Sequence, residues 1–113
     1  MCRNYSKNQR TTTMDKSEAI KKVKAYRILL KDYFQLENVY LFGSYAKNTN
    51  QDDSDIDVAI VVKNVKGDYF SVNPILWKLR RQIDDRIEPI LIEMDFDEAN
   101  FLAEVQKFGI EIS

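Results

Sequence analysis

The sequence predicts a single two-layer domain of the α/β or α+β class, in which helices pack on a small sheet. Apolar residues recur at helical spacing in three segments, and they alternate with period two along residues 55–63, which is typical of a strand. The length of 113 residues suits one domain, and the hydrophobic fraction of 44% is typical of a globular chain. We therefore expect one compact domain over residues 14–113, preceded by a flexible extension over residues 1–13.

The beginning of this domain predicts a helix followed by a buried strand. Asp15 and Glu18 have the spacing of a capping box, and the apolar stripe that follows predicts a helix to about Phe34. Residues 39–42 form a short apolar run that ends at Gly43, as expected of a buried strand.

Residues 55–63 give the strongest strand pattern, and the polar residues 44–54 before them predict a short helix at most. Alternation divides the side chains of this strand between two faces. Asp55 and Asp57 share one face with Ala59, whereas the opposite face is entirely aliphatic.

A second helix and a third strand follow. Asn73 and Pro74 predict the N-cap and the first helical position of a helix that runs to about Asp84. Residues 87–93 predict the strand, and Pro89 within them indicates an edge strand or the start of a strand.

The chain is expected to close with a final helix. Asp95 and Glu98 repeat the capping-box spacing, a stripe of apolar residues predicts a core-facing side, and Gly109 predicts the end. The predicted order is therefore helix, strand, short helix, strand, helix, strand, helix.

Composition excludes several kinds of chemistry. The chain has no histidine, which excludes a Ser-His-Asp or Cys-His relay and a His-ligated zinc or haem site. Its single cysteine, Cys2, cannot form an internal disulfide. Acid–base or metal chemistry must therefore use carboxylates, lysines, tyrosines or hydroxyls.

The net charge of −1 conceals an uneven distribution. Residues 1–31 carry nine Lys/Arg and two Asp/Glu, a net charge of +7, whereas residues 32–113 carry eight and sixteen, a net charge of −8. The basic segment predicts either a solvated helix face or an arm that attracts a phosphate backbone, so nucleic-acid binding stays open as an alternative. The N-terminus has no signal-peptide core, and the longest apolar stretch, residues 58–62, is far too short to span a bilayer. We expect a cytoplasmic protein with no membrane partner.

Gly43 and Ser44 follow a predicted strand and open a short helix. Glycine lets a ligand approach the backbone closely, and the start of a helix presents N–H groups to an anion. The Ser44 hydroxyl can cap that turn or donate to a phosphate. The pair predicts a phosphate-binding turn, and an ordinary strand-to-helix turn is the alternative.

Asp55 and Asp57 place two carboxylates on one face of a strand, with their Cα atoms roughly 7 Å apart. These like charges repel, whereas a divalent cation between them would turn the repulsion into binding. Hard oxygen ligands suit Mg²⁺ or Mn²⁺. A solvated acidic strand start is the alternative. A calcium-binding loop is excluded, because Val58 and Asn64 stand where it requires a glycine and a bidentate glutamate.

Glu88 stands among apolar neighbours at the start of the third strand. An adjacent strand could bring it beside Asp55 and Asp57, where a third carboxylate would serve as a metal ligand or as a base. A position on the surface of an edge strand is the alternative. Glu93, which is expected to point to the opposite face at the other end of the strand, is the rival candidate.

Gly43-Ser44, ten further residues, and Asp55-x-Asp57 within an apolar strand together resemble the DNA polymerase beta-type nucleotidyltransferase superfamily. The short chain and its Leu-Phe-Gly-Ser-Tyr-Ala sequence are similar to the minimal nucleotidyltransferase branch, over about residues 17–111. The resemblance implies the nucleotidyltransferase fold, with a small mixed sheet and helices packed on it.

The resemblance also implies roles for the candidate residues. The Gly43-Ser44 turn would hold a nucleoside triphosphate, with Ser44 contacting phosphate oxygens. Asp55 and Asp57 would hold two Mg²⁺ ions, with Mn²⁺ as a substitute. Glu88 matches the third carboxylate of the family, which shares the metal site and helps to activate the attacking hydroxyl.

Two positions depart from the family pattern. Lys47-Asn48 stands where the family commonly has Arg-Gly, so Lys47 keeps a positive charge for phosphate but loses the bidentate fork. Asn48 can still adopt the left-handed conformation that a glycine would. Glu88 replaces an aspartate and is one methylene longer.

The resemblance implies Mg²⁺-dependent transfer of a nucleoside monophosphate, AMP from ATP or its equivalent from another triphosphate, to a hydroxyl acceptor. Minimal members resemble the antitoxin half of toxin–antitoxin pairs, whose partner is a helical HEPN-type protein, and some add AMP to a tyrosine of that partner. The small domain leaves no obvious room for an acceptor-binding domain, so the acceptor would come from another chain or across a homodimer. The alternative is a non-catalytic antitoxin-like binding protein that retains the fold. Four aromatic residues could stack on a base, although each also fits the core: Tyr40, Phe42, Tyr45 and Trp77.

Overall fold

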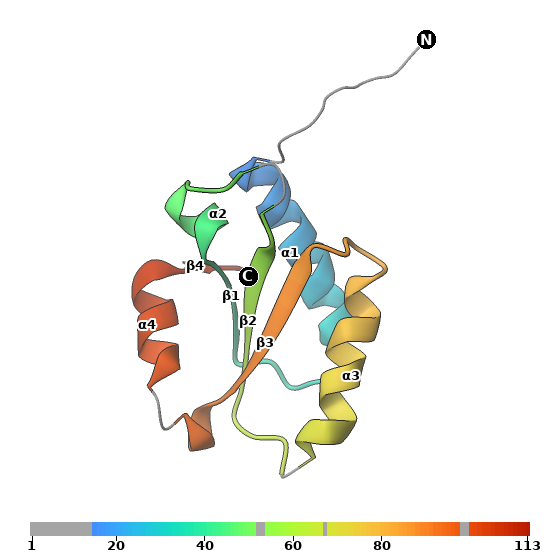
Figure 1. The fold of residues 1–113 in the computed structure, drawn as a ribbon. Coiled ribbons are helices and arrows are strands. Elements are labelled where there is room, and N and C mark those ends of the chain that lie inside the picture. The colour runs from blue at the N-terminus through green and yellow to red at the C-terminus, as the bar shows by residue number, and fades with distance from the viewer. Residues whose placement is uncertain (1–14, 52–53, 67, 98–99) are drawn as a thin grey trace.

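The computed structural model describes residues 15–51, 54–66, 68–97 and 100–113. Within them the chain forms helices that flank a four-stranded sheet (Figure 1). The elements in chain order are α1 (Lys16–Leu30), β1 (Asn38–Phe42), α2 (Ser44–Lys47), β2 (Ile56–Val62), α3 (Tyr69–Arg80), β3 (Ile87–Glu93), a 3₁₀ turn (Met94–Phe96), α4 (Phe101–Phe108) and β4 (Ile110–Glu111). The predicted extension over residues 1–13, and Glu98 of the second predicted capping box, lie outside the described residues.

The sheet is mixed and has the strand order β3-β2-β1-β4. β1 is antiparallel to β2 and to β4, whereas β2 and β3 are parallel. The α+β class and the small mixed sheet are confirmed. β3 has the predicted bounds and lies at an edge, as Pro89 indicated. The two-residue β4 is additional to the predicted elements, because so short a strand has no periodicity of its own.

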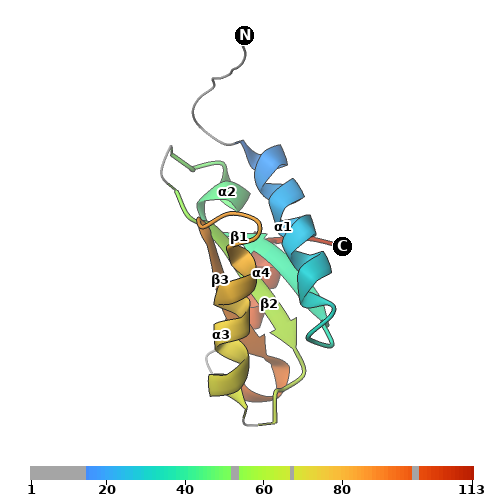
Figure 2. The ribbon, with the colours of Figure 1, turned by 90° about the vertical axis from the view of Figure 1, so that its right-hand side faces the viewer.

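Helices cover the two faces of the sheet unequally (Figures 1 and 2). α1 and α3 pack on the face that contains Ile56, and the buried Tyr26 hydroxyl of α1 donates a 2.7 Å hydrogen bond to the Leu76 carbonyl of α3. α4 packs on the opposite face, where its Val105 meets Ala59 and other buried residues. Asp55 and Asp57 belong to the same face as Ala59, so the shorter helix shares a face with the candidate site.

Two helix starts differ from the prediction. α3 begins at Tyr69 and not at Pro74, which lies inside the helix. The prediction was wrong because the missing N–H of the proline costs only the hydrogen bond to the carbonyl of Phe70. Phe70 lies in the first turn of α3 and is 90% exposed, so water can bind there instead. For α4, the capping carboxylate is Asp97 and not Asp95: its oxygens accept the backbone N–H groups of Phe101 and Leu102 at 3.0 and 2.7 Å.

α1 starts as predicted, since the Asp15 side chain accepts the N–H of Glu18 at 2.9 Å. It ends at Leu30 and passes into a turn, before the expected end near Phe34. None of the described helices is long and apolar enough to cross a membrane.

Candidate active site

The turn between β1 and α2 forms one wall of the candidate site. Gly43 has φ 74° and ψ −148°, a combination that is essentially restricted to glycine. α2 is a single turn of helix, Ser44–Lys47, and the N–H of Lys47 donates to the Gly43 carbonyl at 3.1 Å. Asn48 closes this turn in the left-handed conformation, with φ 61°, as predicted.

Gly43 also makes room for a carboxylate. A Cβ atom added at this position would lie 3.0 Å from Cγ of Asp57 and closer still to its Oδ2. Strand pairing explains the approach, because Asp57 stands opposite Phe42, the residue immediately before the glycine. The absence of a side chain at Gly43 therefore lets the Asp57 carboxylate lie directly against the backbone of the turn.

The parallel pairing of β2 with β3 brings the third carboxylate to the same place. Asp57 pairs with Glu88 in the register, so the two side chains are neighbours on one face of the sheet. The carboxyl group of Glu88 lies within hydrogen-bonding reach of that of Asp55, which precedes β2. Glu93 lies at the far end of β3 and accepts the N–H of Val65 at 3.0 Å, so it is not part of this group.

Two carboxyl groups of this site, those of Asp57 and Glu88, have raised pKa values. Burial raises the pKa of Asp57, and the neighbouring charge of Asp55 raises it further. The pKa of Glu88 is raised mainly by its hydrogen bond with Asp55, which requires a proton between two carboxyls. The positive charge of Arg80 lowers the pKa of Glu88 in part. Without a cation, this group of side chains has more negative charge than its surroundings compensate.

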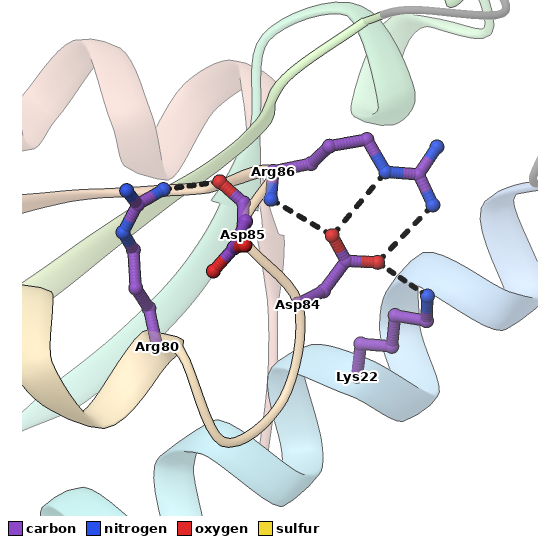
Figure 3. Close-up of polar contacts among 5 residues, drawn as sticks. All are labelled: Lys22, Arg80, Asp84, Asp85 and Arg86. Atoms are coloured by element: carbon purple, nitrogen blue, oxygen red, sulfur yellow. Dashed lines mark hydrogen bonds and ion pairs between the residues drawn. The ribbon is translucent and has the colours of Figure 1, made fainter.

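The turn between α3 and β3 is fixed by two sets of polar contacts just before Glu88 (Figure 3). Asp84 accepts hydrogen bonds from Lys22 of α1 at 2.5 Å and from Arg86, whose Nη2 lies at 3.1 Å. Arg80 donates to the carbonyls of Asp85 and Ile87, the second at 3.2 Å. These contacts fix the chain on both sides of the turn and hence the start of β3.

Arg80 is a residue whose part in this arrangement the sequence did not reveal. Its guanidinium stacks on the Trp77 ring, 4.7 Å from the ring centre. Its Nε is buried and has no hydrogen-bond partner among the described residues. The helical spacing of Trp77 and Arg80 was visible in the sequence, but the turn to which Arg80 bonds was not.

The donor set fits a hard divalent cation. Three carboxylates lie at one end of the sheet, and the space left by Gly43 keeps Asp57 in contact with the turn. Oxygen ligands of this kind suit Mg²⁺ or Mn²⁺. In the part of the chain that the structure describes, no group of three or more acidic or cysteine side chains already has the arrangement of a metal centre. The roles of Asp55, Asp57 and Glu88 as metal ligands stay predictions.

The other predicted residues lie around the same turn. Ser44 is half-buried at the start of α2, and its carbonyl accepts the N–H of Thr49 at 2.9 Å. Lys47 is exposed, with its Nζ 5.7 Å from the centre of the Phe108 ring. Of the aromatic candidates for base stacking, Tyr45 is fully buried in the core, whereas Phe42 lines a cavity beside Gly43.

Comparison with known proteins agrees with this geometry. Residues 18–112 match the family Polymerase beta, Nucleotidyltransferase. A Methanocaldococcus jannaschii relative, provisionally named a protein adenylyltransferase, is 33% identical over 86 residues, which are 74% of this chain and 84% of the relative. The 1.40 Å crystal structure of a Sulfolobus solfataricus protein, provisionally described as a nucleotidyltransferase, has a TM-score of 0.59 and 26% identity, and the match covers 85% of this chain and 80% of that one.

A second solved structure, of a toxin–antitoxin with AMP-PNP, shares the fold with a TM-score of 0.59 and 24% identity, over 88% of this chain and 73% of that one. The family match spans nearly all the described elements, including the Gly43 turn and the strands that bear the three carboxylates. The chain therefore belongs to the polymerase beta-type nucleotidyltransferase family, and it is a nucleotidyltransferase of the minimal branch.

Proposed function

We propose that the protein uses Mg²⁺ to transfer AMP from ATP to a hydroxyl group of a partner protein. The observation that supports this most directly is the position of the Asp57 carboxylate, against Gly43 on one side and beside Glu88 on the other. This position joins a phosphate-binding turn to a set of acidic side chains. Both are needed where a triphosphate is bound and its α-phosphorus is attacked.

The turn would hold the phosphates of the nucleotide. Gly43 has no side chain to obstruct a ligand near its backbone, and Ser44 can donate its hydroxyl to a phosphate oxygen. Lys47 is exposed on the same turn of helix and supplies a positive charge, although an ammonium cannot form the paired hydrogen bonds of arginine.

Asp55, Asp57 and Glu88 are the residues that would hold the cations. Two bound Mg²⁺ ions would supply positive charge at the phosphoryl oxygens and at the leaving group. The carboxylates that hold them must be ionised. The raised pKa values of Asp57 and Glu88 mean that cations and protons compete for this site, so binding is expected to weaken at acid pH.

Glu88 is the proposed base of the transfer step. Its exposed carboxylate takes the proton from the acceptor hydroxyl, and the hydroxyl oxygen forms a bond to the α-phosphorus. The bond from that phosphorus to the oxygen bridging to the β-phosphate breaks, and pyrophosphate leaves with the electron pair. A raised pKa brings a carboxylate closer to the pH at which it can act as a base.

The acceptor is proposed to be a helical HEPN-type protein of a toxin–antitoxin pair in the cytoplasm, with a second copy of the chain as the other candidate. The M. jannaschii relative is named for adenylyl transfer to protein, and one structural neighbour is part of a toxin–antitoxin. Both names support a protein acceptor. ATP is the proposed donor because the relative is named for adenylyl transfer and the structural neighbour is described with AMP-PNP.

The test is incubation with α-labelled ATP, Mg²⁺ and the protein encoded by the neighbouring gene. We expect label in the partner with the wild type and none with Asp55→Ala/Asp57→Ala. The matched control is Asp32→Ala/Glu37→Ala, which removes two exposed carboxylates from the connection between α1 and β1 and should retain activity. Transfer that survives the first double substitution would contradict the mechanism. Stable binding of the partner by the wild type without any transfer would favour the non-catalytic antitoxin-like protein.

A further inference from the structure

A cavity of about 270 Å³ lies beside Gly43, between the β1–α2 turn and α4. Its volume is just below the ~300 Å³ at the lower end of ligand pockets, so it suits a planar heterocycle better than a whole nucleotide. The residues that line it and matter here are Phe42, Gly43, Lys47, Phe101, Glu104 and Phe108.

The α4 side of this cavity is one face of the helix. Phe101, Glu104 and Phe108 are three and four residues apart, so their side chains lie above one another, with the two rings about 10 Å apart along the axis. Phe101 packs edge to face with Phe42, with ring centres 5.8 Å apart at 81°. Phe108 is 52% exposed, unlike a core residue, and its ring remains accessible from the cavity.

Lys47 connects the cavity with the proposed phosphate turn. It is the last residue of α2, which begins directly after Gly43, and its Nζ lies 5.7 Å from the centre of the Phe108 ring. A ligand whose phosphates lie on the turn could therefore reach the cavity with its other end.

We propose that this cavity binds the base of the nucleotide and that the base carries an exocyclic amino group. The inference rests on the proposed function, because it extends the same nucleotide from its phosphates to its base. Aromatic rings stack on the faces of bases, and Phe108 has the exposed ring that such stacking needs. The Glu104 carboxylate can accept a hydrogen bond from an amino group, which makes adenine one of the bases that fit.

The first test compares the binding of ATP and of inorganic tripolyphosphate by calorimetry in the presence of Mg²⁺. Phe108→Ala should weaken ATP binding by about 5- to 150-fold, the loss expected for one stacked base, and leave tripolyphosphate binding unchanged. Because Phe108 is half exposed, its truncation should leave the protein folded, which a thermal melt verifies. The matched control is Phe70→Ala, which removes a phenylalanine that is 90% exposed on α3 and is not among the residues lining the cavity.

The second test concerns Glu104. The wild type should bind ATP several-fold more tightly than purine riboside triphosphate, which is ATP without its amino group. Glu104→Ala should bring the ratio of the two affinities close to one. The ratio is the useful quantity, because removing a negative charge near the phosphates changes both affinities together.

The possible results separate this inference from the proposed function. If tripolyphosphate binds as tightly as ATP, or if Phe108→Ala weakens neither ligand or both equally, base binding in the cavity is wrong and the phosphate turn stands. Equal binding of the two triphosphates by the wild type overturns the role of Glu104. If the wild type binds neither ATP nor tripolyphosphate, the nucleotide site itself is wrong and this inference with it.

Discussion

Gly43→Ala should damage the protein at one identifiable point, the contact between the β1–α2 turn and Asp57. The backbone at Gly43, φ 74° and ψ −148°, costs a residue with a side chain on the order of 1–3 kcal/mol. The new Cβ would also lie 3.0 Å from Cγ of Asp57 and closer to Oδ2, so the carboxylate must move. We expect a total loss of about 2–4 kcal/mol, from a stability that is typically ~5–15 kcal/mol for a domain of this size.

Urea denaturation measures this loss. With a slope of about 2 kcal/mol/M, the midpoint should fall by about 1–2 M. The steric part can be isolated in a double-mutant cycle with Asp57→Ala, which removes the carboxylate that the new Cβ would meet and leaves the Asp57 Cβ at 3.3 Å. Gly43→Ala should therefore cost at least about 1 kcal/mol less in the Asp57→Ala background.

Gly109→Ala is the control for this coupling. Its Cβ would lie 2.6 Å from the Val105 carbonyl oxygen and 3.2 Å from that of Leu41, and Asp57 is not among its nearest neighbours. The substitution is therefore costly in itself, but its cost should be the same in both backgrounds within about 0.5 kcal/mol. If Gly43→Ala leaves the urea midpoint unchanged, or costs as much with Asp57→Ala as without it, the close packing of turn and carboxylate is wrong.

Three further predictions concern stability without metal, measured in EDTA. Asp57→Asn should raise the melting temperature at pH 7, because the raised pKa of Asp57 means that its ionised form destabilises the fold. The gain should disappear as the pH falls and the wild-type carboxyl takes up its proton. A lower melting temperature of the variant at pH 7 would contradict this. Asp84→Asn should lower the melting temperature at pH 7, because the two ion pairs of Asp84 lower its pKa and stabilise the fold at pH values where the carboxyl is ionised. The difference from the wild type should disappear at acid pH. Asp85→Asn, at the adjacent exposed residue, should have little effect. Arg80→Gln should cost about 1–2 kcal/mol and change the emission of Trp77, the sole tryptophan, whereas unchanged fluorescence would argue against the stacked guanidinium.

Local patterns were sufficient for most of the fold. The alternation along residues 55–63 placed Asp55 and Asp57 on the face opposite to Ile56, and the structure confirms it, because a period of two follows from strand geometry alone. The start of α3 was wrong because Pro74, the sixth residue of the helix, is tolerated where the hydrogen bond that it removes would go to the exposed first turn. Such a choice depends on solvent exposure, which the local sequence does not contain.

The candidate site depended on information of a different kind. The pairing of Asp57 with Glu88 is a register between strands far apart in the chain, and the resemblance to a family indicated it where periodicity could not. Neither periodicity nor the family resemblance predicted the cavity beside Gly43. Phe101 and Phe108 belong to the apolar stripe that predicted a core-facing side for the final helix, and only the position of α4 against the turn leaves Phe108 half exposed.

Asp84 and Asp57 differ in how their charges are compensated, and the difference supports a bound cation beside Asp57. Asp84 is paired with Lys22 and Arg86, so its charge is compensated within the fold and its pKa is lowered. Asp57 has Asp55 as its charged neighbour, and burial together with that charge raises its pKa.

An ionised carboxyl that is partly buried beside other carboxyls destabilises a protein, and a glycine in a restricted conformation is required to accommodate this one. Neither feature serves the stability of the sheet, since an aliphatic residue at position 57 would extend the buried cluster of Ala59 and Val61. A bound divalent cation would reverse the balance, because it would stabilise the ionised form. Mg²⁺ should therefore raise the melting temperature of the wild type and not that of Asp57→Asn, and equal stabilisation of both would place the cation elsewhere.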